Sequence, residues 1–130
     1  MVPTVEWKKG SVRLLDQSKL PGSVEFLDCR DYQTVADAIR TLKVRGAPAI
    51  GVTAAMGVAL GAKKINASDY STFSQAVLKI CDELAATRPT AVNLFWAIER
   101  MKGKLESLRT EPISAIKQAL DLESQAILEE

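Results

Sequence analysis

Apolar residues follow two different periods along the chain, and the change falls near residue 31. Before that point, apolar and polar residues alternate, as they do in strands with one buried face. The predicted strands cover residues 4–8, 11–16 and 23–29. Turn residues at Lys9-Gly10 and Pro21-Gly22 separate them, which predicts a three-stranded antiparallel meander over residues 1–30. The meander must lay one face on helices, because so small a sheet is marginal alone. The residues predicted to carry its apolar faces are Val5, Trp7, Val12, Leu14, Val24, Phe26 and Leu27.

From residue 31 onward, apolar residues recur every three or four positions, which predicts a bundle of five helices over residues 31–130. The predicted helices cover residues 32–43, 48–63, 70–86 and 91–108, with a fifth that starts at 110–112 and reaches residue 130. Asp31 or Thr34 is predicted to cap the first helix, and Thr90 to cap the fourth. Residues 1–130 are therefore expected to form one α+β domain, with the small sheet packed on the bundle.

The second predicted helix differs from the others because it is apolar on nearly every side. Residues 47–62 are apolar except for Thr53, so this helix should be surrounded by the rest of the fold. The stretch is shorter than the ~20 residues that a membrane span requires. Gly51, Gly57 and Gly61 suggest that neighbouring helices approach it closely. The sequence therefore predicts a central core helix and no membrane segment.

Composition limits the possible chemistry more than it limits the fold. The 130 residues include 47% hydrophobic and 25% charged residues, with a net charge of +1, so charge favours neither nucleic acid nor a membrane surface as a partner. The chain has no histidine, which removes the usual general base and the commonest metal ligand. Cys29 and Cys81 lack metal or redox spacing and are predicted to be buried free thiols in a reducing cytoplasm. No cofactor or metal site is expected.

Two breaks between helices share a local design that suits an anion. In Val44-Arg45-Gly46-Ala47-Pro48 and in Arg88-Pro89-Thr90, an arginine stands just before a helix start that includes a proline. Helix starts carry unpaired N–H groups and partial positive charge. If the second and fourth helices lie side by side, both arginines could reach one phosphate. The alternative is that each arginine is solvated or pairs locally.

Two residues of the fourth helix also suggest functional roles, and each has a simpler interpretation. Trp96 could stack on a ligand, but it is interpreted as a packing residue of the helix. Asn93, in the first turn, is interpreted as a local partner of the backbone. Neither residue is included in the predicted site.

Residues 44–57 (VRGAPAIGVTAAMG) and 87–101 (TRPTAVNLFWAIERM) strongly resemble the 5-methylthioribose-1-phosphate isomerases of methionine salvage. The opening strands, the Asp28-Cys29-Arg30 region and the helix order are also similar to the N-terminal domain of that family. The resemblance therefore covers essentially the whole chain. Regulatory subunits of the eukaryotic exchange factor for the second initiation factor and archaeal ribose-1,5-bisphosphate isomerase share the superfamily and are the alternative.

The resemblance implies a function and a site. The family converts 5-methylthioribose 1-phosphate to 5-methylthioribulose 1-phosphate without metal or nucleotide. Arg45, Gly46 and Ala47 match its substrate-binding triplet, and Arg88 matches its second basic contact. The family's catalytic Cys and Asp belong to a C-terminal Rossmann-like domain, so no catalytic residue is assigned in this chain. The domain is expected to bind a sugar phosphate and to be inactive alone, and full-length members are expected to form homodimers.

Two rival functions are also compatible with the sequence. One is a regulatory subunit that keeps the fold and binds a sugar phosphate or a nucleotide as an effector. The other is a protein-interaction bundle, with residues 47–62 as its core and both arginines on solvent. Binding of pentose phosphates would separate the isomerase domain and the regulatory subunit from the interaction bundle. The sequence downstream of residue 130 would separate the enzyme from the regulatory subunit.

Overall fold

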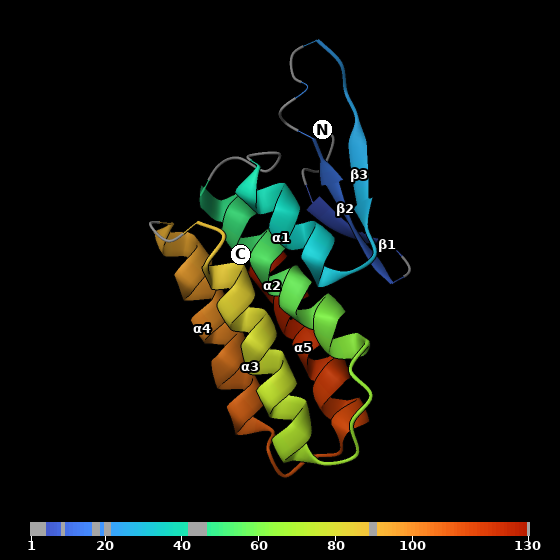
Figure 1. The fold of residues 1–130 in the computed structure, drawn as a ribbon, viewed down its shortest axis with the longest axis vertical. Helices are drawn as coiled ribbons and strands as arrows, with labels where there is room; N and C mark the ends of the chain where they lie inside the picture. The colour runs from blue at the N-terminus through green and yellow to red at the C-terminus, as the bar shows by residue number, and fades with distance from the viewer. Residues whose placement is uncertain are drawn as a thin grey trace.

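The computed structural model describes residues 5–8, 10–16, 19, 22–41, 47–88 and 91–129. Its first elements are three short strands, β1 (Val5–Lys8), β2 (Ser11–Leu15) and β3 (Phe26–Cys29). They form one antiparallel sheet in the order β1-β2-β3. The predicted meander is therefore confirmed, and Figure 1 shows it at one end of a helical bundle.

Of the residues predicted to supply the apolar face of β3, Leu27 lies on the buried face opposite Leu14, but Val24 and Phe26 do not. Val24 and Phe26 are 61% and 37% exposed, whereas Cys29 is fully buried. Residues directly opposite each other in an antiparallel pair share a face of the sheet. Because Val12 pairs with Cys29, the buried face of β2 continues into Cys29 rather than into Phe26. Phe26 lies on the other face, under the guanidinium group of Arg13 at 4.1 Å.

Five helices follow the sheet in the described part of the chain, as the periodicity predicted. They are α1 (Tyr32–Arg40), α2 (Ala47–Lys63), α3 (Tyr70–Ala85), α4 (Val92–Ser107) and α5 (Ile113–Glu129). The prediction that Thr90 caps the fourth helix is wrong, because the N-cap is Ala91, which makes no side-chain capping bond. Thr90 itself lies outside the described residues.

The start of α1 is held by Asp31, which settles the choice between the two predicted caps. Asp31 Oδ1 accepts hydrogen bonds from the backbone N–H and the hydroxyl of Thr34, both at 2.7 Å. These two bonds, the hydroxyl bond foremost, hold the pKa of the Asp31 carboxyl below its usual value. A lowered pKa in the folded state means that the charged cap stabilises the fold at neutral pH and loses this contribution as the pH falls through that pKa.

We therefore expect Asp31→Ala to lower the free energy of unfolding by about 1 kcal/mol at pH 7, the usual cost of losing an N-cap. The difference from the parent chain should shrink below about pH 4, where the carboxyl becomes protonated. Urea unfolding at pH 7 and pH 3 measures both values. Asp37→Ala is the control, because this exposed carboxyl only faces Arg40 at 3.9 Å. An equal loss at both pH values would contradict a charged cap.

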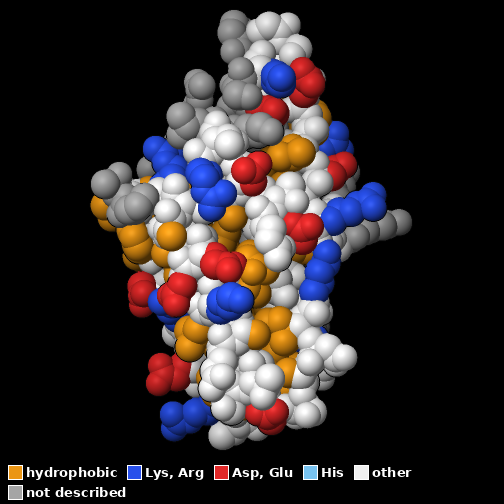
Figure 2. Space-filling model, viewed as in Figure 1, with side chains coloured by type: hydrophobic (Ala, Val, Ile, Leu, Met, Phe, Trp, Pro, Cys, Tyr) orange, Lys and Arg blue, Asp and Glu red, His pale blue; other side chains and the backbone are white. Residues whose placement is uncertain are grey.

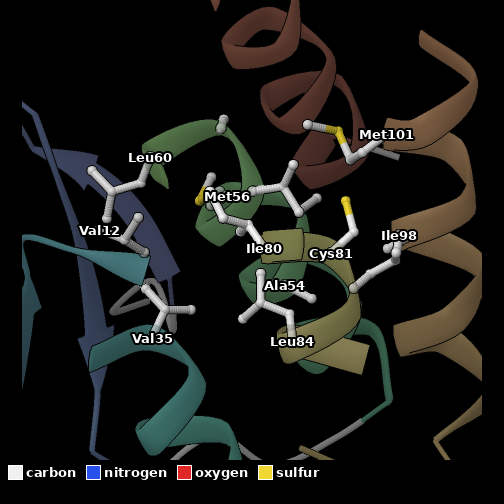
Figure 3. Packing of buried hydrophobic residues seen from close by; sticks show 14 of the residues in the cluster. Val12, Val35, Ala54, Met56, Leu60, Ile80, Cys81, Leu84, Ile98 and Met101 are labelled. Carbon is white, nitrogen blue, oxygen red and sulfur yellow. The ribbon is translucent and has the colours of Figure 1, made fainter. Parts of the chain in front are cut away.

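The core is organised around α2, which runs through the middle of the bundle (Figure 1) and contacts both the sheet and the other four helices. Figure 3 shows buried side chains from β2, α1, α3 and α4 converging on Ala54, Met56 and Leu60 of α2. Those three residues are at most 1% exposed. The predicted inward residues of α3 and α4 are also buried: Phe73, Val77, Ile80, Cys81, Leu84, Leu94, Ile98, Met101 and Leu105. The prediction of a surrounded central helix is confirmed.

The glycines of α2 explain how its neighbours come so close. A Cβ atom on Gly61 would lie 2.6 Å from Ile80 Cδ1 of α3 and 3.1 Å from a ring carbon of Tyr32 in α1. A Cβ atom on Gly57 would meet Val35 Cγ1 at 3.0 Å. At separations this short a Cβ atom would displace these neighbouring side chains, so the glycines let α1 and α3 pack closely against α2. In the part of the chain that the structure describes, no helix has the length and apolarity to cross a membrane.

Candidate anion site at the start of α2 and α4

Helices α2 and α4 begin side by side at one end of the bundle, shown at the upper left of Figure 1. Gly51, in the second turn of α2, faces the first turn of α4, because a Cβ atom on it would lie 2.9 Å from the carbonyl oxygen of Asn93. The same Cβ would lie 3.6 Å from Ala97 Cβ. The two helices therefore lie next to each other, as a shared anion site at their starts requires.

Two of the four predicted site residues lie in the described part of the structure. Arg45 and Gly46 lie outside the described residues. Ala47 is the first residue of α2. Arg88 stands in the turn before α4, where it is half-buried and its carbonyl oxygen accepts a hydrogen bond from Ala91 N at 3.0 Å. The fold thus brings Ala47 and Arg88 to the same end of the bundle, and the convergence of Arg45 with Arg88 stays a prediction.

The electrostatics at this end favour an anion. The first turns of α2 and α4 contain no acidic residue, and Ala91 offers α4 no side-chain acceptor. By contrast, α1 and α3 carry the carboxylates of Asp31 and Asp69 at their starts. Among the described residues, no carboxylate forms an ion pair with Arg88. The N–H groups at the start of α4 and the Arg88 cation are therefore available to an anion that binds here.

Neither cysteine supplies an activated thiol. Cys29 and Cys81 are both fully buried, as predicted. Burial raises the pKa of the Cys81 thiol to about 12, so it stays protonated at neutral pH and is a poor nucleophile. No group of three His, Cys, Asp or Glu residues in the described ranges is placed to hold a metal ion. The chemistry that the site offers is binding of a charged ligand.

Trp96 is not the packing residue that the sequence analysis predicted. Its side chain is 51% exposed, and the guanidinium carbon of Arg100 lies 5.5 Å from the centre of its ring. Arg100 in turn forms a 2.6 Å ion pair with Glu123 of α5. The apolar stripe of α4 was assigned correctly at Leu94, but Trp96 faces away from that stripe.

Comparisons with known proteins add a family and several relatives. The sequence model described as "Initiation factor 2 subunit family" matches residues 43–130. The methylthioribose-1-phosphate isomerase of Syntrophotalea carbinolica is 55% identical over 126 residues, which are 97% of this chain and 37% of that protein. The enzyme of the same name from Geotalea daltonii is 52% identical over 127 residues, again with 37% of its length covered. The chain therefore spans little more than a third of the length of these relatives.

Solved structures show the same relation. The crystal structure of 5-methylthioribose 1-phosphate isomerase from Pyrococcus horikoshii matches with a TM-score of 0.95 and 38% identity. The match covers 99% of this chain and 36% of that one. Subunit delta of translation initiation factor eIF-2B from A. fulgidus matches with a TM-score of 0.90, also at 38% identity, over 99% of this chain and 37% of that one. The whole fold, sheet included, recurs in both.

Proposed function

The chain belongs to the initiation factor 2 subunit family, and from this premise we propose that it is the substrate-binding N-terminal domain of a 5-methylthioribose-1-phosphate isomerase. The proposal assigns binding of the sugar phosphate to Arg45, Gly46, Ala47 and Arg88. It assigns no catalytic residue to this chain. Relatives that carry the isomerase name at 52–55% identity over nearly the whole chain support this choice within the family.

The observation that carries the proposal is the shared start of α2 and α4. The close approach of Gly51 to Asn93 brings the starts of α2 and α4, which follow the two basic breaks of the sequence, to one end of the bundle. A phosphate there would accept hydrogen bonds from N–H groups of the helix starts and from an arginine fork. Both kinds of donor suit a phosphate monoester, which carries up to two negative charges at neutral pH.

Holding the phosphate would serve the reaction by fixing the sugar carbons. The phosphate blocks the anomeric oxygen, so the ring must open at the bond between C1 and the ring oxygen. The hydrogen on C2 ends on C1, and the proton of the C2 hydroxyl ends on the ring oxygen, which leaves the C2 ketone. A phosphate anchored by Arg88 and the helix starts would place C1 and C2 before the groups that move these hydrogens. Those groups are expected in the part of the relatives that this chain does not cover.

We expect Arg88→Met to weaken binding of 5-methylthioribose 1-phosphate by roughly 10–100-fold, because the loss of one charge-assisted hydrogen bond costs about 1.5–3 kcal/mol. Isothermal titration calorimetry on the chain measures the change. The parent chain should bind the ligand without turning it over.

Arg109→Met is the matched control, because Arg109 is an exposed arginine in the turn after α4, at the opposite end of that helix. It should leave the affinity unchanged. Equal affinities of the parent chain and Arg88→Met would remove Arg88 from the site. Turnover by the chain alone would refute the assignment of catalysis to another domain.

A second function has specific support in the match to subunit delta of eIF-2B, whose identity to this chain equals that of the isomerase structure. A regulatory subunit of this kind would use the same end of the bundle for an effector. The two functions differ in selectivity, because only the isomerase domain should prefer the methylthio sugar over ribose 1-phosphate. Competition between these two ligands in the same calorimeter decides between the two functions.

Location in the cytoplasm and dimerisation of the full-length protein stay predictions.

A further inference from the structure

A cavity opens near the end of α2, where the start of α1, the last turn of α2 and the middle of α3 meet. It has a volume of about 310 Å³, which is within the size range of small-ligand sites. Its walls are largely apolar. Gly61 and Ile65 contribute from α2 and the segment after it, Ala76 and Ile80 from α3, and Tyr32 from α1. Figure 2 shows hydrophobic side chains at the surface between charged ones on the face that α1, α2 and α3 form.

Packing holds the apolar walls of this cavity in place. A Cβ atom on Gly61 would lie 2.6 Å from Ile80 Cδ1 and 3.1 Å from a ring carbon of Tyr32, so both side chains rest against the backbone of α2. The hydroxyl of Tyr32 donates a hydrogen bond to Glu83 of α3, and this bond, followed by burial, raises the pKa of Tyr32 to about 12. The ring is therefore neutral and tied to α3. Walls that are already ordered lose little conformational freedom when a ligand binds.

Two lysines give the cavity a positive charge. Lys64 and Lys79 line it, and among the described lining residues Asp31 is the only carboxylate. That carboxylate already accepts two hydrogen bonds from Thr34. Lys64 donates one hydrogen bond, to the carbonyl oxygen of Arg30, whereas Lys79 has neither a hydrogen bond nor an ion pair with any described residue. Because an ammonium group has three N–H donors, both lysines can still bind an anionic group.

We propose that this cavity between α1, α2 and α3 binds a small organic acid that combines an apolar body with one carboxylate or sulfonate group. The body would displace water from the apolar walls, and the acid group would meet Lys64 and Lys79. A bare phosphate lacks the body, and a cation of the same shape would face two like charges. The cavity lies at the end of α2 opposite to Ala47, so the proposal does not depend on the proposed function.

Naphthalene-1-sulfonate is the probe, because its fused rings form an apolar body and its sulfonate is ionised. Calorimetry on the chain should give a Kd of about 1 mM or lower, the affinity expected of about 14 non-hydrogen atoms at a modest ligand efficiency. The cation 1-naphthylmethylammonium carries the same rings and should bind at least about tenfold more weakly. Inorganic phosphate should not compete with the sulfonate. Equal binding of the cation, or no binding of the sulfonate up to about 10 mM, would overturn the proposal.

Two substitutions locate the probe in the cavity. Lys79→Glu should weaken binding of the sulfonate by about 3–20-fold, because it removes one attraction between exposed groups and adds one repulsion. Ala76→Phe should weaken it by at least about tenfold, since the new ring would occupy the space of the probe. If Ala76→Phe does not fold, Lys79→Glu alone decides, because the Lys79 side chain is exposed.

Lys19→Glu is the matched control, because Lys19 is an exposed lysine that does not line the cavity. It should leave the affinity for the sulfonate unchanged. Unchanged affinity in Lys79→Glu, or an equal loss in Lys19→Glu, would overturn the proposal by placing the probe elsewhere on the chain. Lys79→Glu should also leave binding of 5-methylthioribose 1-phosphate unchanged, so a failure of this site is distinguishable from a failure of the anion site at the start of α2 and α4.

Discussion

Gly51→Ala is expected to lower the free energy of unfolding by about 2 kcal/mol and the midpoint of thermal unfolding by about 6–10 °C. The new methyl group would lie 2.9 Å from the carbonyl oxygen of Asn93. That atom belongs to the backbone of α4, so no rotamer change can relieve the contact and the two helices must separate. The gain in helix propensity, up to about 1 kcal/mol, offsets only part of the cost. Thermal and urea unfolding of the two proteins measure the difference.

The matched control for Gly51→Ala is Gly103→Ala, which adds the same atom to an exposed position of α4 with open space around it. Here only the helix propensity changes, and the chain should become more stable by up to about 1 kcal/mol. Opposite signs for the two substitutions would show that contact between α2 and α4, rather than loss of glycine, controls the result. A stabilising Gly51→Ala would contradict the close approach on which the candidate site depends.

Periodicity along the chain predicted the elements well because burial in this fold follows each helix's own repeat. Leu94, Ile98 and Met101 share one side of α4, so their spacing alone revealed the buried stripe. The errors occur where a neighbouring element, rather than the position along the residue's own element, decides whether a side chain is buried. The phase of β3 depends on the pairing of Val12 with Cys29, which is set by the partner strand.

The candidate site was predicted only in part. That Arg88 and Ala47 lie near helix starts could be read from local turn chemistry, and the structure confirms both positions. That these starts share one end of the bundle depends on the tertiary contact of Gly51 with Asn93, which no local pattern encodes.

The exposure of Trp96 was missed because an aromatic residue beside a buried stripe is normally part of it. A solvent-facing tryptophan next to a predicted ligand site is a feature that the repeat of the helix cannot explain, and it is therefore more informative about a partner than about the core.

Leu84→Ala is expected to lower the free energy of unfolding by about 3 kcal/mol, because Leu84 is fully buried between α2 and α3 and the change leaves a cavity. Leu122→Ala is its control, since Leu122 is 59% exposed and should cost well under 1 kcal/mol. Urea unfolding of the three proteins measures both values.

The cavity left by Leu84→Ala can be partly refilled from the facing helix. A Cβ atom on Gly57 would lie 3.0 Å from Val35 Cγ1 and 3.3 Å from Leu84 Cδ1, and Leu84→Ala removes only the second of these close contacts. Gly57→Ala should therefore destabilise the parent chain by about 1 kcal/mol and Leu84→Ala by less, because only the contact with Val35 remains there, which gives a coupling of roughly 0.5 kcal/mol. Gly103→Ala, far from the cavity, should add its effect independently in both backgrounds. Additive effects of Gly57→Ala and Leu84→Ala would mean that these two positions do not share the space between α2 and α3 that Figure 3 shows Leu84 occupying.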